Sequence, residues 1–153
     1  MKKLLLIIIV LLLTNTVSYG KGIDPYIEIL RSDARSQKVA VITEAMQFTG
    51  KESSAFWPVY REYELELSEI MDDRIELIKD FFQNYDNLID EKAKELARKV
   101  FALEKRRTKL KKKYFKKFEK ALSATIAAKF IQVENQINLL IDLQIASELP
   151  LIK

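Results

Sequence analysis

The 153-residue chain contains neither cysteine nor histidine, and each absence removes a class of chemistry. Without cysteine there is no disulfide, no thiolate nucleophile and no lipid attached to a cysteine behind an export signal. Without histidine the chain lacks the commonest general base and the commonest transition-metal ligand. A Ser-His-Asp arrangement and a Glu-x-x-His di-iron site are therefore both impossible. We expect a protein that is not an enzyme and that uses no metal or cofactor.

Glycine and proline are scarce as well, with three residues of each, and two of the glycines come before residue 23. Both residue types mark turns, so little of the chain is suited to tight loops. This composition favours long helices, and the fold class we expect is all-α, in a single domain. The formal net charge is only +4, so the distribution of charge matters more than its sum.

The first twenty residues are typical of an export signal. Lys2 and Lys3 precede an uninterrupted apolar run from Leu4 to Leu13, and a more polar stretch then ends at Gly20. The apolar run is too short for a membrane-spanning helix, which takes about 20 residues. We expect cleavage after Gly20, a periplasmic location and one helical domain over residues 21–153. An uncleaved membrane anchor is the alternative interpretation.

Two helices are expected in the first half of this domain. Asp24-Pro25 provides an N-cap followed by proline at the first helical position, and this helix would run to about Gln47. A break near residues 32–36, or a short strand at residues 39–42, is an alternative. The second helix begins at Thr49, which is spaced with Glu52 as a capping box. We expect it to continue through Pro58 with a kink.

Two further helices follow a turn at Asp86-Asn87. The third is expected from about Asp90 to Lys120, and the fourth from about Ala124 to Ser147, with Ser123 as its N-cap. In the second and third helices apolar residues recur in steps of four and three, as in a coiled coil. Arg74 and Arg107 each occupy an apolar position of these seams. The seams are Phe56, Tyr60, Tyr63, Leu67, Ile70, Leu77, Phe81 and Tyr85, and Ala93, Leu96, Val100, Leu103, Leu110, Tyr114 and Phe118.

The expected helix lengths imply an elongated shape. Helices of roughly 30 to 36 residues are about 45–55 Å long, whereas a compact domain of this size has a radius of gyration near ~14 Å. The second and third helices would form a long antiparallel central hairpin. A thin layer of helices can bury only one face against itself. The other face then needs a partner subunit, a client protein or an unusually polar surface.

The most distinctive local feature is the segment from Lys105 to Lys120, in which ten of sixteen residues are basic and three are aromatic. On a helix these residues form a cationic band around an aromatic stripe. Such a surface would attract anionic or partly unfolded partners and contact their apolar segments. A solvated face with core aromatics is the competing interpretation, anionic lipid headgroups are another, and nucleic acid is disfavoured by export. The candidate partner-binding residues are Arg107, Lys111, Tyr114, Phe115 and Phe118.

Two other clusters have simpler interpretations. Phe56, Trp57, Tyr60 and Tyr63 surround Pro58 and could form a docking pocket, but core packing is the favoured interpretation. Several of the acidic residues between positions 62 and 73 share a helix face, and carboxylates among lysines usually form i,i+4 ion pairs on a solvated surface. We therefore expect no metal site there.

Two short segments open the second and fourth expected helices: Phe48-Thr49-Gly50-Lys51-Glu52 and Leu122-Ser123-Ala124-Thr125-Ile126. With these segments, the export signal and the four-helix layout, the chain resembles the Spy/CpxP-like family of exported all-helical proteins, which carry two LTxxQ motifs. Glutamate replaces the family's glutamine in the first copy, and isoleucine replaces it in the second. The resemblance covers most of residues 24–147, and the stretch from Phe56 to Tyr63 resembles an uncharacterised branch.

The resemblance implies a cradle-shaped antiparallel homodimer that acts as an ATP-independent periplasmic chaperone or as an envelope-stress protein. The metal binding that some relatives achieve through histidine is not expected here. The function we expect is therefore that of an exported, non-catalytic protein that binds unfolded or envelope proteins through a basic and apolar helical face. A signalling adaptor that binds one specific sensor or envelope protein is the alternative.

Overall fold

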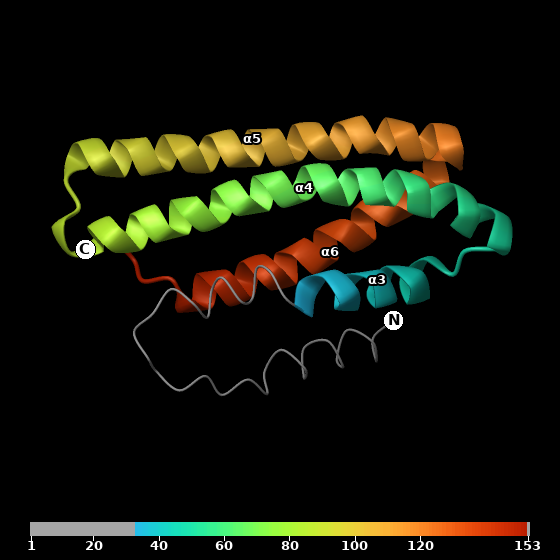
Figure 1. Ribbon diagram of the computed structural model, residues 1–153, viewed down its shortest axis with the longest axis horizontal. Helices are drawn as coiled ribbons and strands as arrows, with labels where there is room; N and C mark the ends of the chain where they lie inside the picture. Colours follow the sequence, from blue (N-terminus) through green and yellow to red (C-terminus); the bar gives the residue numbers. More distant parts are fainter. Residues whose placement is uncertain (1–32, 153) are drawn as a thin grey trace.

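The computed structural model describes residues 33–152, so the expected export signal and the start of the first expected helix lie outside the described residues. The described chain is helical almost throughout, as Figure 1 shows, and no strand occurs in it. The expected all-α fold is confirmed. Its elements are α3 (Asp33–Met46), α4 (Gly50–Asn84), the short 3-10 helix η1 (Tyr85–Asn87), α5 (Asp90–Ala121) and α6 (Ala124–Glu148).

Helix α3 is continuous across residues 39–42, so the alternative of a short strand there is wrong. The helix ends because Gln47 adopts a φ of 50°, in the left-handed region that commonly terminates helices. The Gln47 backbone N–H still donates to the Thr43 carbonyl at 3.2 Å. The chain can then turn directly into α4.

The starts of α4 and α6 are fixed by the expected caps. Thr49 Oγ1 accepts from the Glu52 backbone N–H at 3.3 Å, and the Glu52 carboxylate accepts from the Thr49 N–H at 2.9 Å. These bonds form the predicted capping box and hold the pKa of Glu52 below its usual value. Ser123 Oγ caps α6 by accepting from the Ile126 N–H at 3.2 Å. Helix α4 also continues through Pro58, as predicted.

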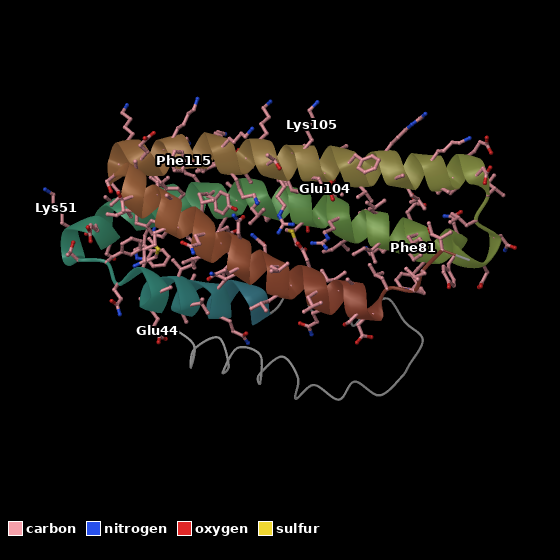
Figure 2. The ribbon with its side chains drawn as sticks, turned by 180° about the vertical axis from the view of Figure 1, so that it is seen from behind. Glu44, Lys51, Phe81, Glu104, Lys105 and Phe115 are labelled. Carbon is pink, nitrogen blue, oxygen red and sulfur yellow. The ribbon has the colours of Figure 1, made fainter. Side chains whose placement is uncertain are left out.

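Helices α4 and α5 form the long antiparallel hairpin expected from the sequence (Figure 1). Helix α6 begins beside the end of α5 and runs obliquely away from it, and α3 packs against α6 (Figures 1 and 2). All four helices meet near the start of α4, which we call the proximal end. At the distal end, near η1, α5 is supported mainly by α4.

The proximal end contains a core rich in aromatic rings. The rings of Phe56 and Phe118 lie 5.0 Å apart, and those of Phe118 and Phe130 lie 4.6 Å apart. Offset and edge-to-face ring pairs of this kind add to the free energy of burying apolar surface. The favoured interpretation of the aromatic cluster near Pro58, as core, is confirmed for its buried members Phe56, Tyr60 and Tyr63.

The predicted seam of α4 is correct only in its first half. Phe56 to Ile70 are buried in the expected steps, but beyond Arg74 the buried residues are Ile75 and Ile78, with Leu77 and Phe81 only partly buried. Arg74 Nη1 donates to Asp142 of α6 at 2.6 Å. Because α6 crosses the hairpin obliquely, the face of α4 that it covers rotates along the helix, which a strict heptad cannot follow.

The two faces of the hairpin differ in what covers them. Helices α6 and α3 cover one face. On α4 the opposite face is exposed and mostly polar, with Leu65 as its large apolar exception. This is the third option that the sequence left open, an unusually polar surface. The exposed residues of this face are Pro58, Arg61, Leu65, Glu69, Asp72 and Glu76.

Candidate functional site

The structure separates the five predicted partner-binding residues. The rings of Tyr114 and Phe118 are fully buried in the proximal core, and Phe115 is half-buried at its edge (Figure 2). The prediction that Tyr114 and Phe118 contact a partner is therefore wrong for the subunit described. The spacing correctly identified one stripe of α5, but the stripe faces inward, because α4 and α6 both pack against it.

Tyr114 has a structural role in this core. Its hydroxyl donates to Glu66 Oε1 at 2.7 Å, and burial together with that carboxylate raises the pKa of Tyr114, so the group stays a neutral phenol. Lys113 and Lys117 lie over the ring, with Nζ 5.3 and 4.6 Å from its centroid. Two basic residues of the segment therefore serve the packing of a core ring.

Arg107 and Lys111 face α6. Arg107 Nη1 lies 3.2 Å from Asp142 Oδ2, and Arg74 holds the other oxygen of the same carboxylate. Lys111 Nζ donates to Asn135 Oδ1 at 2.8 Å. The pKa of Lys111 is lowered mainly by burial and, to a smaller extent, by repulsion from the Arg107 charge. Two arginines share one carboxylate, so this part of the α5/α6 interface keeps an excess of positive charge.

A third group of basic residues pairs across the hairpin. Lys117 Nζ lies 2.7 Å from Glu62 and Lys113 Nζ lies 2.6 Å from Glu66, while Arg106 pairs with Asp73. These contacts place Glu62, Glu66 and Asp73 of α4 in ion pairs, which join two helices rather than successive turns of one.

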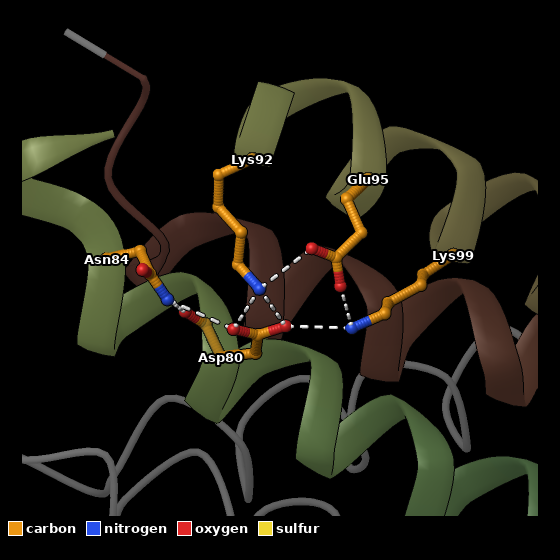
Figure 3. Close-up of polar contacts among 5 residues, drawn as sticks. All are labelled: Asp80, Asn84, Lys92, Glu95 and Lys99. Atoms are coloured by element: carbon orange, nitrogen blue, oxygen red, sulfur yellow. Dashed lines mark hydrogen bonds and ion pairs between the residues drawn. The ribbon is translucent and has the colours of Figure 1, made fainter. Parts of the chain in front are cut away.

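Nearer η1 the pairs converge on one carboxylate. In Figure 3 the Asp80 carboxylate accepts from Lys92 and Lys99 of α5, both at 2.9 Å, and from Asn84 at 3.0 Å. The hydrogen bonds from Lys92 and Lys99 hold the pKa of Asp80 below its usual value. Glu95 and then Asp80 raise the pKa of Lys99, and Asp80 and then Glu95 raise the pKa of Lys92. At the distal end these ionic contacts add to a smaller set of buried apolar side chains, among them Ile78 and Leu96.

Apart from Lys94, whose Nζ lies 3.7 Å from Glu91, the remaining basic residues of α5 lie along its outer edge and form no hydrogen bond or ion pair within residues 33–152. Their spacing in steps of three, four or seven puts them in one line, and all are exposed. Lys105 is seen projecting away from the bundle in Figure 2. Sequence reasoning treated the basic segment as a single band and missed this division, although the spacing contains it. We call this line the lysine ridge: Arg98, Lys105, Lys109, Lys112, Lys116 and Lys120.

Helix α6 presents an exposed apolar surface beside Lys111. An open, shallow depression there is lined mainly by apolar atoms, with Asn135 at its edge next to Lys111. Leu139 and, one turn further, Leu143 are 68% and 65% exposed. We call the depression and these two leucines the α6 surface. The lining residues are Ala128, Ile131, Gln132, Asn135, Gln136 and Leu139.

A buried polar cluster joins α3, α4 and α6, and nothing in the sequence pointed to it. Glu134 Oε1 accepts from Lys38 Nζ at 2.9 Å, from the Tyr63 hydroxyl at 2.8 Å and from Asn138 Nδ2 at 3.0 Å. Lys38 also donates to Glu64 at 2.6 Å. Burial raises the pKa of Tyr63, so it remains a donor. The cluster sets one cation against two carboxylates, and Glu134 Oε2 is buried without a hydrogen-bond partner in the described chain. We interpret the cluster as a device that fixes how three helices meet.

The described residues offer neither a metal-binding cluster nor a membrane-spanning helix. Among them, no three acidic side chains come together in a way that could hold a metal ion. None of the helices in this part of the chain is long and apolar enough to cross a bilayer.

No family model matches the chain, and neither a curated protein nor a solved structure is found to match it.

Proposed function

We propose that this protein is an exported, non-catalytic binding protein that holds unfolded or envelope proteins on its α6 surface, as an ATP-independent periplasmic chaperone. The observation that supports this best is the exposed apolar α6 surface bordered by Lys111 on a bundle whose own core is closed. Exposed apolar area of this kind is the usual mark of a surface that binds another molecule.

The form of the α6 surface suits a tolerant binder. The depression is open and shallow, so it imposes little shape on what it contacts. Leu139 and Leu143 offer apolar contact, and the amides of Gln132 and Gln136 offer hydrogen bonds to an extended backbone. Nearby positive charge from Arg74, Arg107 and Lys111 would attract clients before apolar contact forms.

The resemblance to the Spy/CpxP-like family also supports a chaperone role. Both motif positions in this chain lie at helix starts with a capping hydroxyl, that of Thr49 and that of Ser123. A homodimer is part of this proposal. The mass of the protein in solution, measured by sedimentation equilibrium, tests this part of the proposal. A dimeric mass is expected. A monomeric mass at all concentrations would contradict the cradle-shaped homodimer.

The test of client binding is suppression of aggregation, followed by light scattering of a chemically denatured client diluted into buffer. The purified protein should suppress scattering at near-stoichiometric ratio, and Leu139→Gln/Leu143→Gln should weaken this several-fold. Leu65→Gln is a matched control, because Leu65 is equally exposed but lies on the opposite side of the hairpin. Absence of protection even at low salt would exclude the proposal.

The signalling adaptor is the competing outcome of the same experiments. It would appear as one stoichiometric envelope protein recovered in a pull-down, without any general protection of denatured clients.

A further inference from the structure

The lysine ridge is chemically unlike the other basic residues of α5. Arg106, Lys113 and Lys117 are neutralised by α4, and Arg107 and Lys111 bond to α6. The six ridge cations have no such partners among residues 33–152. On the same face, helical spacing places one carboxylate between residues 98 and 120, that of the exposed Glu119. The ridge therefore keeps a net charge of about five, in line and fully hydrated.

The geometry of the ridge is a straight edge. From Arg98 to Lys120 the helix rises about 33 Å, and α5 runs without interruption over that length. Figure 2 shows this edge at the outer limit of the bundle, with the side chains directed away from the other helices. A plane placed against the edge meets all six cations at once. Neither the depression on α6 nor a second one between α4 and α5 is lined by any of these six residues.

The residue types indicate what kind of anion the ridge fits. Five of the six cations are lysines, which act as hydrated point charges, whereas arginine would provide the planar two-pronged contact typical of specific phosphate recognition. Phe101, which is 66% exposed, lies in line between Arg98 and Lys105. A single exposed ring among lysines is suited to the boundary between lipid headgroups and acyl chains.

We propose that the lysine ridge docks this protein on the surface of a membrane that contains anionic phospholipids, with α5 lying parallel to the bilayer. The lysines gain electrostatic attraction from many headgroups at once, and Phe101 enters the headgroup region. Nucleic acid fits less well, because the ridge has no row of aromatic rings on which bases could stack. An acidic folded protein fits less well, because the ridge has no apolar centre to bury.

This inference goes beyond the proposed function and does not depend on it. The ridge lies on the outer edge of α5 (Figure 2), whereas Lys111, which borders the α6 surface, is on the side of α5 that faces α6. Docking by the ridge would therefore leave the α6 surface open to solvent and to clients.

The test is sedimentation of the purified protein with vesicles of phosphatidylcholine alone and of phosphatidylcholine mixed with phosphatidylglycerol. Binding is expected only to the anionic vesicles and should weaken progressively as salt rises. Lys109→Glu/Lys116→Glu should weaken this binding by at least about tenfold, since each lysine near such a surface contributes on the order of 1 kcal/mol. A matched control is Lys51→Glu/Arg61→Glu, which makes the same change in net charge at exposed positions of α4 and should stay within about twofold of the parent protein.

Three results would overturn the proposal. These are no binding to anionic vesicles at low salt, equal losses in the ridge and control variants, or binding to single-stranded DNA without binding to vesicles. The last would mark the ridge as a site for a linear polyanion. Failure here is distinguishable from failure of the proposed function, because Leu139→Gln/Leu143→Gln should bind vesicles normally and the ridge variant should still protect a denatured client.

Discussion

The two ends of the α4–α5 hairpin are held together by different forces. At the proximal end four helices meet around stacked and edge-to-face rings, and buried charges of Lys38 and Glu134 are paired inside. At the distal end α5 depends largely on α4, Val100 and Phe101 are exposed, and Asp80 gathers Lys92 and Lys99. Apolar burial contributes far more per residue than exposed ion pairs do.

This difference explains how a long thin hairpin can exist without a thick core along its whole length. The larger aromatic core lies at the proximal end, and the distal end is kept in place by helix continuity, ionic contacts and a few buried side chains such as Ile78 and Leu96. Functional surfaces can then occupy the outer sides of α5 and α6, since those sides are not needed for folding. The predictions below test this division, beginning with the largest expected effect.

Phe118→Ala should destabilise the protein most. It removes a fully buried ring that packs on Phe56 and Phe130, and such truncations cost about 3–5 kcal/mol. The free energy of unfolding can be measured by denaturant titration followed by circular dichroism. Phe101→Ala is the control, because that ring is exposed and its loss should cost no more than about 0.5 kcal/mol. Equal losses in the two variants would contradict the assignment of Phe118 to the core.

Lys38→Met should cost about 3 kcal/mol, because it leaves the Glu134 carboxylate buried without a cation. Adding Glu134→Gln should recover part of this loss, since a neutral amide oxygen can still accept from Tyr63 and Asn138. Lys105→Met, on the ridge, should leave the unfolding free energy nearly unchanged. The interpretation fails if Lys38→Met is as stable as the parent protein.

Ile78→Ala should cost about 2 kcal/mol, at the low end for a buried aliphatic side chain, because the distal end has fewer helices around it. Hydrogen exchange should rise first in amides near η1 and at the start of α5, with little change around Phe56 or Phe118. A uniform rise along the hairpin would show that the two ends unfold as one unit.

The smallest expected effect is the loss of unfolding free energy when acid protonates one paired carboxylate, that of Glu66. Hydrogen bonds from Lys113 and Tyr114 hold the pKa of Glu66 below its ordinary value of 4.5. The stability from this ionised carboxylate is complete above that value and is lost as the pH falls through the lowered pKa. The free energy of unfolding of Glu66→Gln should therefore fall less steeply below pH 4.5 than that of the parent protein, with a difference of no more than about 1 kcal/mol. Identical pH profiles would argue against the pairing.

The helix boundaries were predictable because local chemistry sets them. Thr49, Asp90 and Ser123 mark helix starts in the sequence, and the structure places α4, α5 and α6 at those positions to within a residue. The register of burial beyond Ile70 was not predictable, since it depends on the angle at which α6 crosses the hairpin. A strict coiled-coil repeat assumes nearly parallel neighbours and so selected Leu77 and Phe81 in place of Ile75 and Ile78.

The candidate site was predictable only in part. Spacing along α5 contains the lysine ridge, but it does not tell which side of a helix faces its neighbours, so Tyr114 and Phe118 were assigned to a partner surface. The pairing of Lys38 with Glu134 joins residues 96 positions apart and leaves no periodic signal. Whether a charged residue is solvated or buried is decided by packing between elements, which one sequence does not specify.

The single tryptophan of the chain, Trp57, lies at the proximal end, half-buried between Phe56 and Tyr60, and its indole N–H donates to Ser53. Its fluorescence therefore reports the environment of that end alone. The backbone ellipticity of the long helices reports both ends. If heating lowers the ellipticity while the indole emission stays unchanged, the helix that is lost lies outside the proximal end. The two ends of this rod would then be seen to unfold separately, without any added label.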